Sequence, residues 1–170
     1  MSDMPEEPLK ASPETFRLLA SRLQRIFKDD LKRDLQHDEE SLIYLDGYIE
    51  RNKAVLTKHE GLVNLIGAFL GECLIARYGG EWVDDPKMGW GVKIANELTA
   101  FPFSKVEKRF KPDGQYDSIA SFYRSTPALL KHLREEKQKK GSVDPSTSFP
   151  YSSLNFYLVY TLAFCMVILT

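Results

Sequence analysis

Glu72 is the residue whose type and setting come nearest to catalytic chemistry in this chain. It stands in a segment, residues 62–76, that is otherwise almost entirely apolar. A carboxyl buried among apolar side chains can act as a general acid or base. Asn64 lies two helical turns earlier on about the same face, where it can be a hydrogen-bonding neighbour. Because no second catalytic group has a readable spacing to Glu72, we expect a buried polar pair, with Glu72 bonded to an arginine or a backbone N–H.

The other candidates are aromatic residues that gather in the middle of the chain. Trp82, Trp90 and Tyr116 stand out among them. Most of these rings should pack a sheet against the apolar helix. Any that remain partly exposed are suited to anchoring a partner protein, since aromatic side chains often dominate the energy of protein interfaces. The sequence therefore predicts these three as binding residues.

Motifs for other chemistry are missing from the sequence. His37, His59 and His132 are scattered, and none forms the helical His–Glu spacing of a zinc protease. Cys73 and Cys165 lie far apart, which is neither a disulfide framework nor a metal-ligand spacing. The sequence contains no nucleophile elbow, phosphate-binding loop or dinucleotide fingerprint. We therefore expect no catalytic residue, no metal site and no cofactor.

Length and charge limit the function further. The chain has 170 residues, with 23 basic against 24 acidic side chains and a net charge of −1. This length corresponds to about one domain. A neutral balance argues against nucleic acid as a partner, because that affinity comes mainly from excess Lys and Arg. The first residues lack the basic and apolar stretches of a secretory signal, so we expect the domain to stay in the cytoplasm.

Three helices are predicted in the first half of the chain. Ser12 can cap the first, with Pro13 at its first helical position. The second is predicted over residues 38–52, where acidic residues at the start suit the helix dipole. The third is predicted over residues 60–78 and is apolar on nearly all sides, which is typical of a buried central helix.

A close contact is predicted on one face of the central helix. Gly67 and Gly71 are one turn apart and share that face. Without side chains they allow another backbone to approach, so we expect the helix to pack on the sheet through them.

The hydrophobic period then changes from helical to alternating. Strands are predicted over residues 81–83, 90–94 and 99–103, joined by short turns that favour an antiparallel meander. Residues 104–110 fit either an extension of the last strand or a short helix. Pro102 has no N–H for a sheet ladder, so its strand should lie at an edge or end there.

The remaining part of the domain reads as helical. Asp117 or Ser118 can cap one short helix, and Thr126 followed by Pro127 can cap a second. The predicted fold is therefore α+β, with three N-terminal helices, a small antiparallel sheet of three to four strands, and one or two C-terminal helices.

The chain also divides by composition. We expect a disordered N-terminus over residues 1–11, a single α+β domain over 12–140, a polar linker over 141–153 and an apolar tail over 154–170. The tail, Leu154 to Thr170, carries no charge. As a helix it would span about 25 Å, slightly less than the ~30 Å of bilayer hydrocarbon.

Three other interpretations of the tail stand beside a membrane anchor. It can be a buried final helix, or a final strand, since it is rich in β-branched and aromatic residues. It can also be an aberrant end of the reading frame, unrelated to the domain before it.

Several segments in order resemble a known family. They are SLIYLDGYIERN (41–52), LIGAFLGECLIARYGGEW (65–82), WGVKI (90–94), AFPFSKVEKRF (100–110) and DSIASFY (117–123). Together they cover about half the chain, and their order resembles a family of small, uncharacterised, mostly bacterial domains with no assigned activity. The resemblance implies a shared fold and transfers no catalytic residue. The apolar tail lies outside it.

The sequence favours a non-catalytic binding or regulatory module with a protein partner. Small neutral domains of this type can act as inhibitors or immunity proteins; this analogy rests on the kind of domain and not on a recognised site. Two alternatives remain. One is a domain tethered to a membrane through residues 154–170, and the other is an unrecognised hydrolase that uses Glu72.

Overall fold

The structure is a computed structural model that describes residues 10–56 and 61–141. The chain divides into two compact units, Met1–Glu135 and Glu136–Thr170. Of the described residues, 136–141 fall in the second unit and all others in the first. The predicted linker and apolar tail lie outside the described residues, as does most of the predicted disordered N-terminus.

The three predicted N-terminal helices are confirmed. They are α1 (Pro13–Leu31), α2 (Glu39–Leu56) and α3 (Leu62–Tyr78). Ser12 caps α1 as predicted, because its hydroxyl oxygen accepts a hydrogen bond from the Thr15 amide at 3.2 Å. The cap fixes where α1 begins, and the helical spacing of Phe16, Ala20, Leu23 and Phe27 determines which face the core covers.

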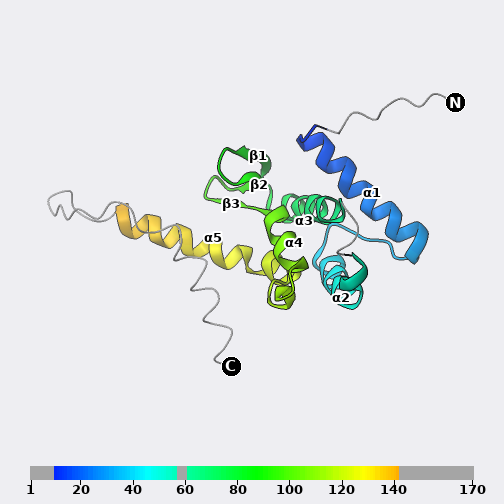
Figure 1. Cartoon of the computed structure of the whole chain (residues 1–170). Helices are drawn as coiled ribbons and strands as arrows, with labels where there is room; N and C mark the ends of the chain where they lie inside the picture. The colour runs from blue at the N-terminus through cyan, green and yellow to red at the C-terminus, as the bar shows by residue number, and fades with distance from the viewer. Residues whose placement is uncertain (1–9, 57–60, 142–170) are drawn as a thin grey trace. The chain divides into compact units, whose positions relative to one another are not determined.

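The sheet has three antiparallel strands in the order β1-β2-β3. They are β1 (Glu81–Asp85), β2 (Gly89–Ile94) and β3 (Leu98–Ala100). Short turns join them, as the alternating pattern predicts. The molecule is therefore an α+β protein, in which three helices precede the sheet along the chain and further helices follow it (Figure 1).

The third strand is shorter than predicted, and the extension to Phe103 was wrong. Strand β3 ends at Ala100, and helix α4 (Pro102–Phe110) begins immediately afterwards. The reason is Pro102 itself. It lies in the first turn of α4, where a missing N–H leaves no helical hydrogen bond unmade. Residues 104–110 are therefore helical.

The two short helices predicted after residue 117 are one helix. A 3₁₀ turn, η1 (Gly114–Tyr116), leads into α5 (Ile119–Gly141), and Pro127 lies inside α5. Thr126 therefore does not begin a second helix. Its hydroxyl instead donates to the Phe122 carbonyl at 3.2 Å, one turn earlier on the same helix. The missing amide of Pro127 is compensated by a hydrogen bond from the Tyr78 hydroxyl.

Helix α3 lies at the centre of the unit, with α1 on one side and α4 on the other (Figure 1). Its two glycines mark the closest approaches. A Cβ added at Gly71 would meet the Trp82 ring of β1, which confirms the predicted packing on the sheet. A Cβ at Gly67 would meet Phe103, which belongs to α4 and not to a strand. Both glycines therefore make room for an aromatic ring.

Candidate functional site

An open groove lies where four elements meet. Its lining comes from the start of α1, the start of α3, the turn between β1 and β2, and α4. We call it the Trp90 groove. Its volume is about 640 Å³, which is in the range of ligand sites. Its apolar members are Phe16, Leu19, Leu65, Met88, Trp90 and Phe103.

A cluster of four aromatic rings supports the groove. Phe16 is at its centre, with ring centroids 5.2 Å from Trp90, 5.1 Å from Phe103 and 4.6 Å from Trp82. Tilted and edge-on contacts of this kind add to the stability gained by burial. The rings come from α1, β1, β2 and α4, so the cluster joins these elements. Trp90 is therefore held in place while it still lines an open surface.

Polar side chains surround the apolar part. Arg22 of α1 and Glu107 of α4 are exposed and lie among the lining residues, as do Asn64 and Ser104. Asn64 was predicted to be a buried neighbour of Glu72, and this was wrong, because its side chain is exposed at the groove. Asn64 lies in the first turn of α3, where the helix is less buried than at its centre. An apolar floor with a polar rim is the usual anatomy of a protein-binding surface.

Trp82 belongs to the core and not to a surface. It is 6% exposed, and its indole N–H donates to the Glu72 carboxylate at 2.8 Å. The prediction that Trp82 anchors a partner therefore fails on burial. The same bond shows what Glu72 does. Its partner is an indole rather than the expected arginine or backbone amide, and Glu72 does not line the Trp90 groove. The geometry gives the carboxylate a structural role.

Tyr116 is exposed and lies apart from the groove. It ends the 3₁₀ turn η1, and it is 72% exposed. The structure thus brings Trp90 and Asn64 together and leaves Tyr116 elsewhere. Phe103, Leu19 and Met88 were not singled out in the sequence as groove residues. Their apolar character was visible there, but the packing of α1 and α4 beside the β1–β2 turn was not.

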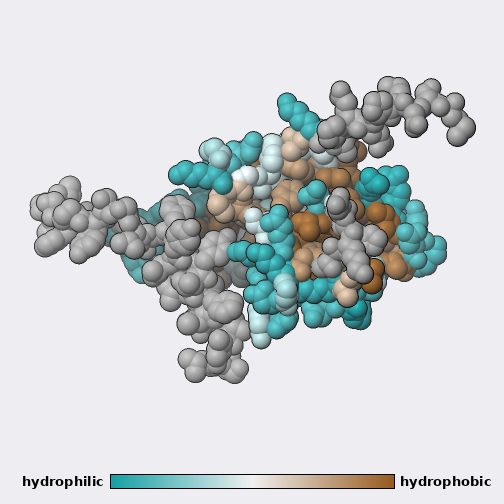
Figure 2. Space-filling model, viewed as in Figure 1, coloured by the Kyte–Doolittle hydropathy of each residue, from teal (hydrophilic) through white to brown (hydrophobic). Residues whose placement is uncertain are grey.

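A hydrophobic area is visible on one face of the molecule. Figure 2 shows a brown area where α1, α2 and α3 come together, bordered by teal side chains. Large apolar residues that are exposed on these helices include Leu18, Ile26, Ile43 and Val55. Exposed apolar area of this kind commonly marks an interaction surface.

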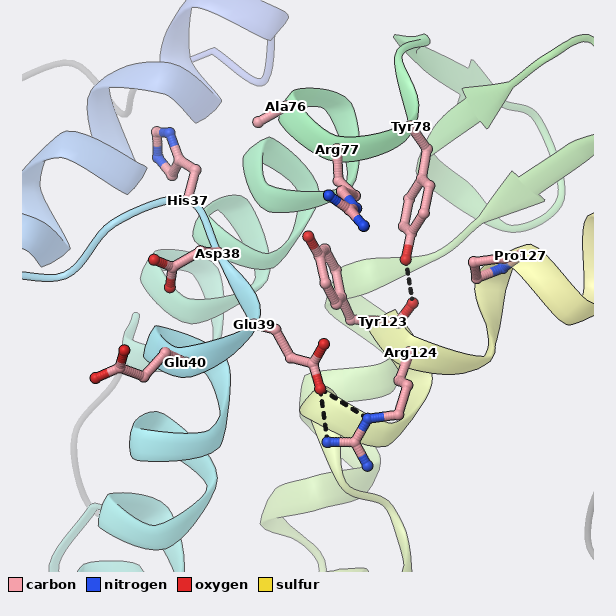
Figure 3. A pocket seen from close by; sticks show the side chains of 10 residues that line it. All are labelled: His37, Asp38, Glu39, Glu40, Ala76, Arg77, Tyr78, Tyr123, Arg124 and Pro127. Atoms are coloured by element: carbon pink, nitrogen blue, oxygen red, sulfur yellow. Dashed lines mark hydrogen bonds and ion pairs between the residues drawn. The ribbon is translucent and has the colours of Figure 1, made fainter.

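A second hollow, of about 630 Å³, lies beside α3 and α5, and we call it the Tyr123 hollow. Arg77, Tyr78 and Tyr123 point toward one another in it, and Glu39 pairs with Arg124 at its edge (Figure 3). Burial is the main cause that raises the pKa of Tyr123 to about 12. The hollow carries charges of both signs, so it does not select an anion or a cation.

The hollow also explains why Pro127 is tolerated in α5. In a regular helix the amide of residue 127 would donate to the Tyr123 carbonyl, and proline has no amide hydrogen. The Tyr78 hydroxyl donates to this carbonyl instead, at 3.0 Å (Figure 3). Tyr78 therefore replaces the lost helical bond and ties α5 to the end of α3.

This replacement predicts that the two positions are coupled. Tyr78→Phe should lower the free energy of unfolding by about 1–2 kcal/mol, because the buried carbonyl loses its donor. In the Pro127→Ala background the new amide supplies the bond, so the same change should cost much less. Urea unfolding of the wild type, both single variants and the double variant measures the coupling. Purely additive effects would refute the replacement.

The most connected polar cluster was not predicted from the sequence. The Asp46 carboxylate of α2 accepts hydrogen bonds from Arg109 Nε at 3.0 Å, from Ser118 Oγ at 2.6 Å, and from the amides of Ile119 at 3.1 Å and Ala120 at 2.9 Å. It therefore caps the start of α5, where a negative charge also suits the helix dipole. The partners are distant in sequence, so no local pattern indicates them.

Arg109 completes this cluster from α4. Its side chain is 5% exposed, and it also donates to the Gly114 carbonyl at 2.9 Å and pairs with Glu50 at 2.8 Å. All of its contacts are to side chains and backbone that hold α2, α4 and α5 together. The cluster therefore links α2 and α4 to the start of α5.

The remaining candidates are possible metal ligands, the Cys73 thiol and a membrane-spanning segment. No group of three His, Cys, Asp or Glu side chains comes together as metal ligands there. Cys73 is fully buried in α3, and this burial raises the pKa of its thiol, which keeps the unreactive protonated form. In the same part of the chain, no helix has the length and apolar character needed to cross a bilayer.

Comparison with known proteins adds no identity to this geometry. No protein-family model, curated protein or solved structure matches the chain.

Proposed function

We propose that this chain is a non-catalytic protein-binding module and that the Trp90 groove binds the apolar face of a helix from its partner. One observation carries the proposal. Trp90 is held by an aromatic cluster and yet lines an open apolar groove built by four elements. A rigid aromatic side chain in such a position loses little conformational freedom on binding and is a typical centre of binding energy.

The shape of the groove favours a helix as the bound segment. Apolar side chains at positions i, i+3, i+4 and i+7 of a helix form one row, and a row of this kind fits a groove between elements. The rim adds direction, because Arg22 stands on α1 and Glu107 on α4. A partner helix with an acidic residue toward α1 and a basic residue toward α4 is complementary to both.

A regulatory role agrees with these features. The polar clusters at Glu72 and at Asp46 are occupied by structural bonds. A binding module acts by occupying its partner, so an inhibitor- or immunity-type protein from a mainly bacterial family is the role that we propose. The feature that would identify the partner is an exposed amphipathic helix.

The proposal predicts that Trp90→Ala abolishes tight binding. Helical peptides would be selected from a displayed library on the immobilised full chain, and their affinities measured by calorimetry. Removal of a central aromatic anchor typically costs 2 kcal/mol or more, so we expect affinity to fall by about 30-fold or more.

Two further variants control for folding and for nonspecific binding. Met88 is 55% exposed at the edge of the groove, so Met88→Glu should weaken binding without disturbing the core. Tyr116→Ala removes an equally prominent aromatic side chain outside the groove and should leave the affinity unchanged. Selected peptides that bind all three variants as well as wild type would rule out the groove as the site.

A further inference from the structure

The Tyr123 hollow contains a cationic group and a hydroxyl group that have no acidic partner. Arg77 forms no ion pair with a carboxylate in the part of the chain that the structure describes. Among the same residues the Tyr123 hydroxyl has no hydrogen-bond partner, although this tyrosine is only 4% exposed. The two side chains point toward each other (Figure 3). Two donors therefore converge at one place in the hollow, and no described carboxylate occupies it.

The Tyr123 hydroxyl remains a donor at neutral pH. Burial is the main cause that raises its pKa to about 12, so the hydroxyl keeps its proton below that pH. The neighbouring Tyr78 cannot replace it as a donor. The Tyr78 proton is already used in the hydrogen bond to the Tyr123 carbonyl, at 3.0 Å.

Negative charge lies on the side of the hollow that comes from the start of α2. The acidic residues that line this side are Asp38, Glu39 and Glu40. Glu39 and Glu40 each pair with an arginine at 2.7 Å. Asp38 accepts from the Ser41 amide at 2.8 Å through one carboxylate oxygen, so its second oxygen can accept from a ligand. The hollow therefore offers a positive group at Arg77 and a negative group at Asp38.

We propose that the Tyr123 hollow binds the free C-terminus of a peptide that carries a basic residue a short distance upstream. The terminal carboxylate accepts hydrogen bonds from Arg77 and from the Tyr123 hydroxyl, and charge-assisted bonds of this kind are strong. The basic side chain lies toward Asp38. Capture of a terminal carboxylate is a recurring mode of peptide recognition. The site is separate from the Trp90 groove, so it does not rest on the proposed function.

The size and lining of the hollow favour a peptide over a small anion. Its volume of about 630 Å³ is in the range of ligand sites. Ala76 and Pro127 add apolar surface to the lining, which an apolar side chain at the end of the peptide can cover. A peptide with a basic residue also carries charges of both signs, as the hollow does, whereas a small anion carries only one.

The test is an NMR titration of the isotope-labelled full chain with a library of tripeptides. Each is acetylated at its N-terminus, begins with lysine, continues with two variable apolar residues and ends in a free carboxylate. We expect the best binders to shift the Tyr123 and Ala76 signals to saturation. Amidation of the C-terminus of the same peptide should lower the affinity about tenfold or more, because a hydrogen-bonded charge is lost. Norleucine in place of lysine should lower it only about two- to fivefold, since pairs between partly exposed charges are weak.

Tyr123→Phe is the most specific variant, because it removes the hydroxyl and keeps the buried ring. No hydrogen bond of that hydroxyl is lost in the described domain, so the free energy of unfolding should not change. The affinity for the free-acid peptide should fall about tenfold, whereas the amidated peptide should bind this variant and wild type equally. Arg77→Gln should lower the affinity for the free acid by a similar factor. Arg51→Gln removes the same charge from an exposed position of α2 outside the hollow and should change nothing.

Each contrary result has a definite meaning. Equal affinity for the free-acid and amidated peptides, or equal affinity of wild type and Tyr123→Phe for the free acid, would overturn the proposal. Failure of every tripeptide to bind at millimolar concentration would also overturn it. If N-acetylalanine bound as tightly as the best tripeptide, with the same losses in the variants, the ligand would be a small free carboxylate and not a peptide. None of these results bears on the Trp90 groove, whose test uses other signals.

Discussion

Replacement of Asp46 by alanine is expected to lower the free energy of unfolding by about 3–5 kcal/mol, which is the usual cost of breaking a buried ion pair by removing one partner. The carboxylate is 14% exposed and faces Arg109, which is 5% exposed. Without it, the guanidinium keeps only Glu50 as a charged partner, and Glu50 is 53% exposed. The amides of Ile119 and Ala120 also lose their acceptor at the start of α5. Unfolding in urea, followed by circular dichroism, measures the change.

A surface ion pair provides the matched comparison. Glu39 and Arg124 also join α2 to α5, at 2.7 Å, but their side chains are 44% and 59% exposed. Glu39→Ala should therefore cost no more than about 1 kcal/mol. If Asp46→Ala were no more destabilising than Glu39→Ala, the cluster would not hold α2, α4 and α5 together as described.

The second large effect is expected at Gly71, where even one methyl group should destabilise the fold. The added Cβ would meet the Trp82 ring, which is buried and bonded to Glu72. The ring has nowhere to move in a packed core, so overpacking should cost about 1–3 kcal/mol. Gly71→Ala should also shift Trp82 fluorescence, because the indole must leave its hydrogen bond.

Gly47 is the control for the glycine substitution. It also lies inside a helix, but a Cβ there would meet only the end of the flexible Arg51 side chain. Gly47→Ala should therefore stabilise α2, by up to about 1 kcal/mol, because alanine is the better helix former. If Gly71→Ala lowers the free energy of unfolding and Gly47→Ala raises it, the effect at Gly71 comes from packing and not from helix propensity. If both substitutions are stabilising, α3 does not approach Trp82 closely.

Local signals predicted much of the architecture. Ser12 and Pro13 specify the start of α1, and the alternation around Trp90 specifies β2, because both signals act within a few residues. The errors come from prolines. Pro102 and Pro127 each lie in a position that the chain accommodates, the first in a helix start and the second beside Tyr78. Only the second requires a distant partner, which no local pattern contains.

The site could be predicted only in part for the same reason. Trp90 was identified from its residue type, and the structure places it at an open groove. Trp82 is also a tryptophan and lies on the neighbouring strand β1, but its ring packs in the core because Gly71 leaves room for it. Sequence alone could not separate them, because burial depends on which helix covers which side of the sheet. Arg109 and Asp46 were missed because they meet across 63 residues.

The central claim is that the Trp90 groove is the binding surface, and the most direct measurement is an NMR titration of the isotope-labelled full chain with a selected helical peptide. We expect the amide and side-chain signals of Asn64, Trp90 and Ser104 to shift with a common dissociation constant, while those of Tyr78 and Tyr123 stay in place. Shifts confined to the Tyr123 hollow, or spread over the surface without saturation, would contradict the claim.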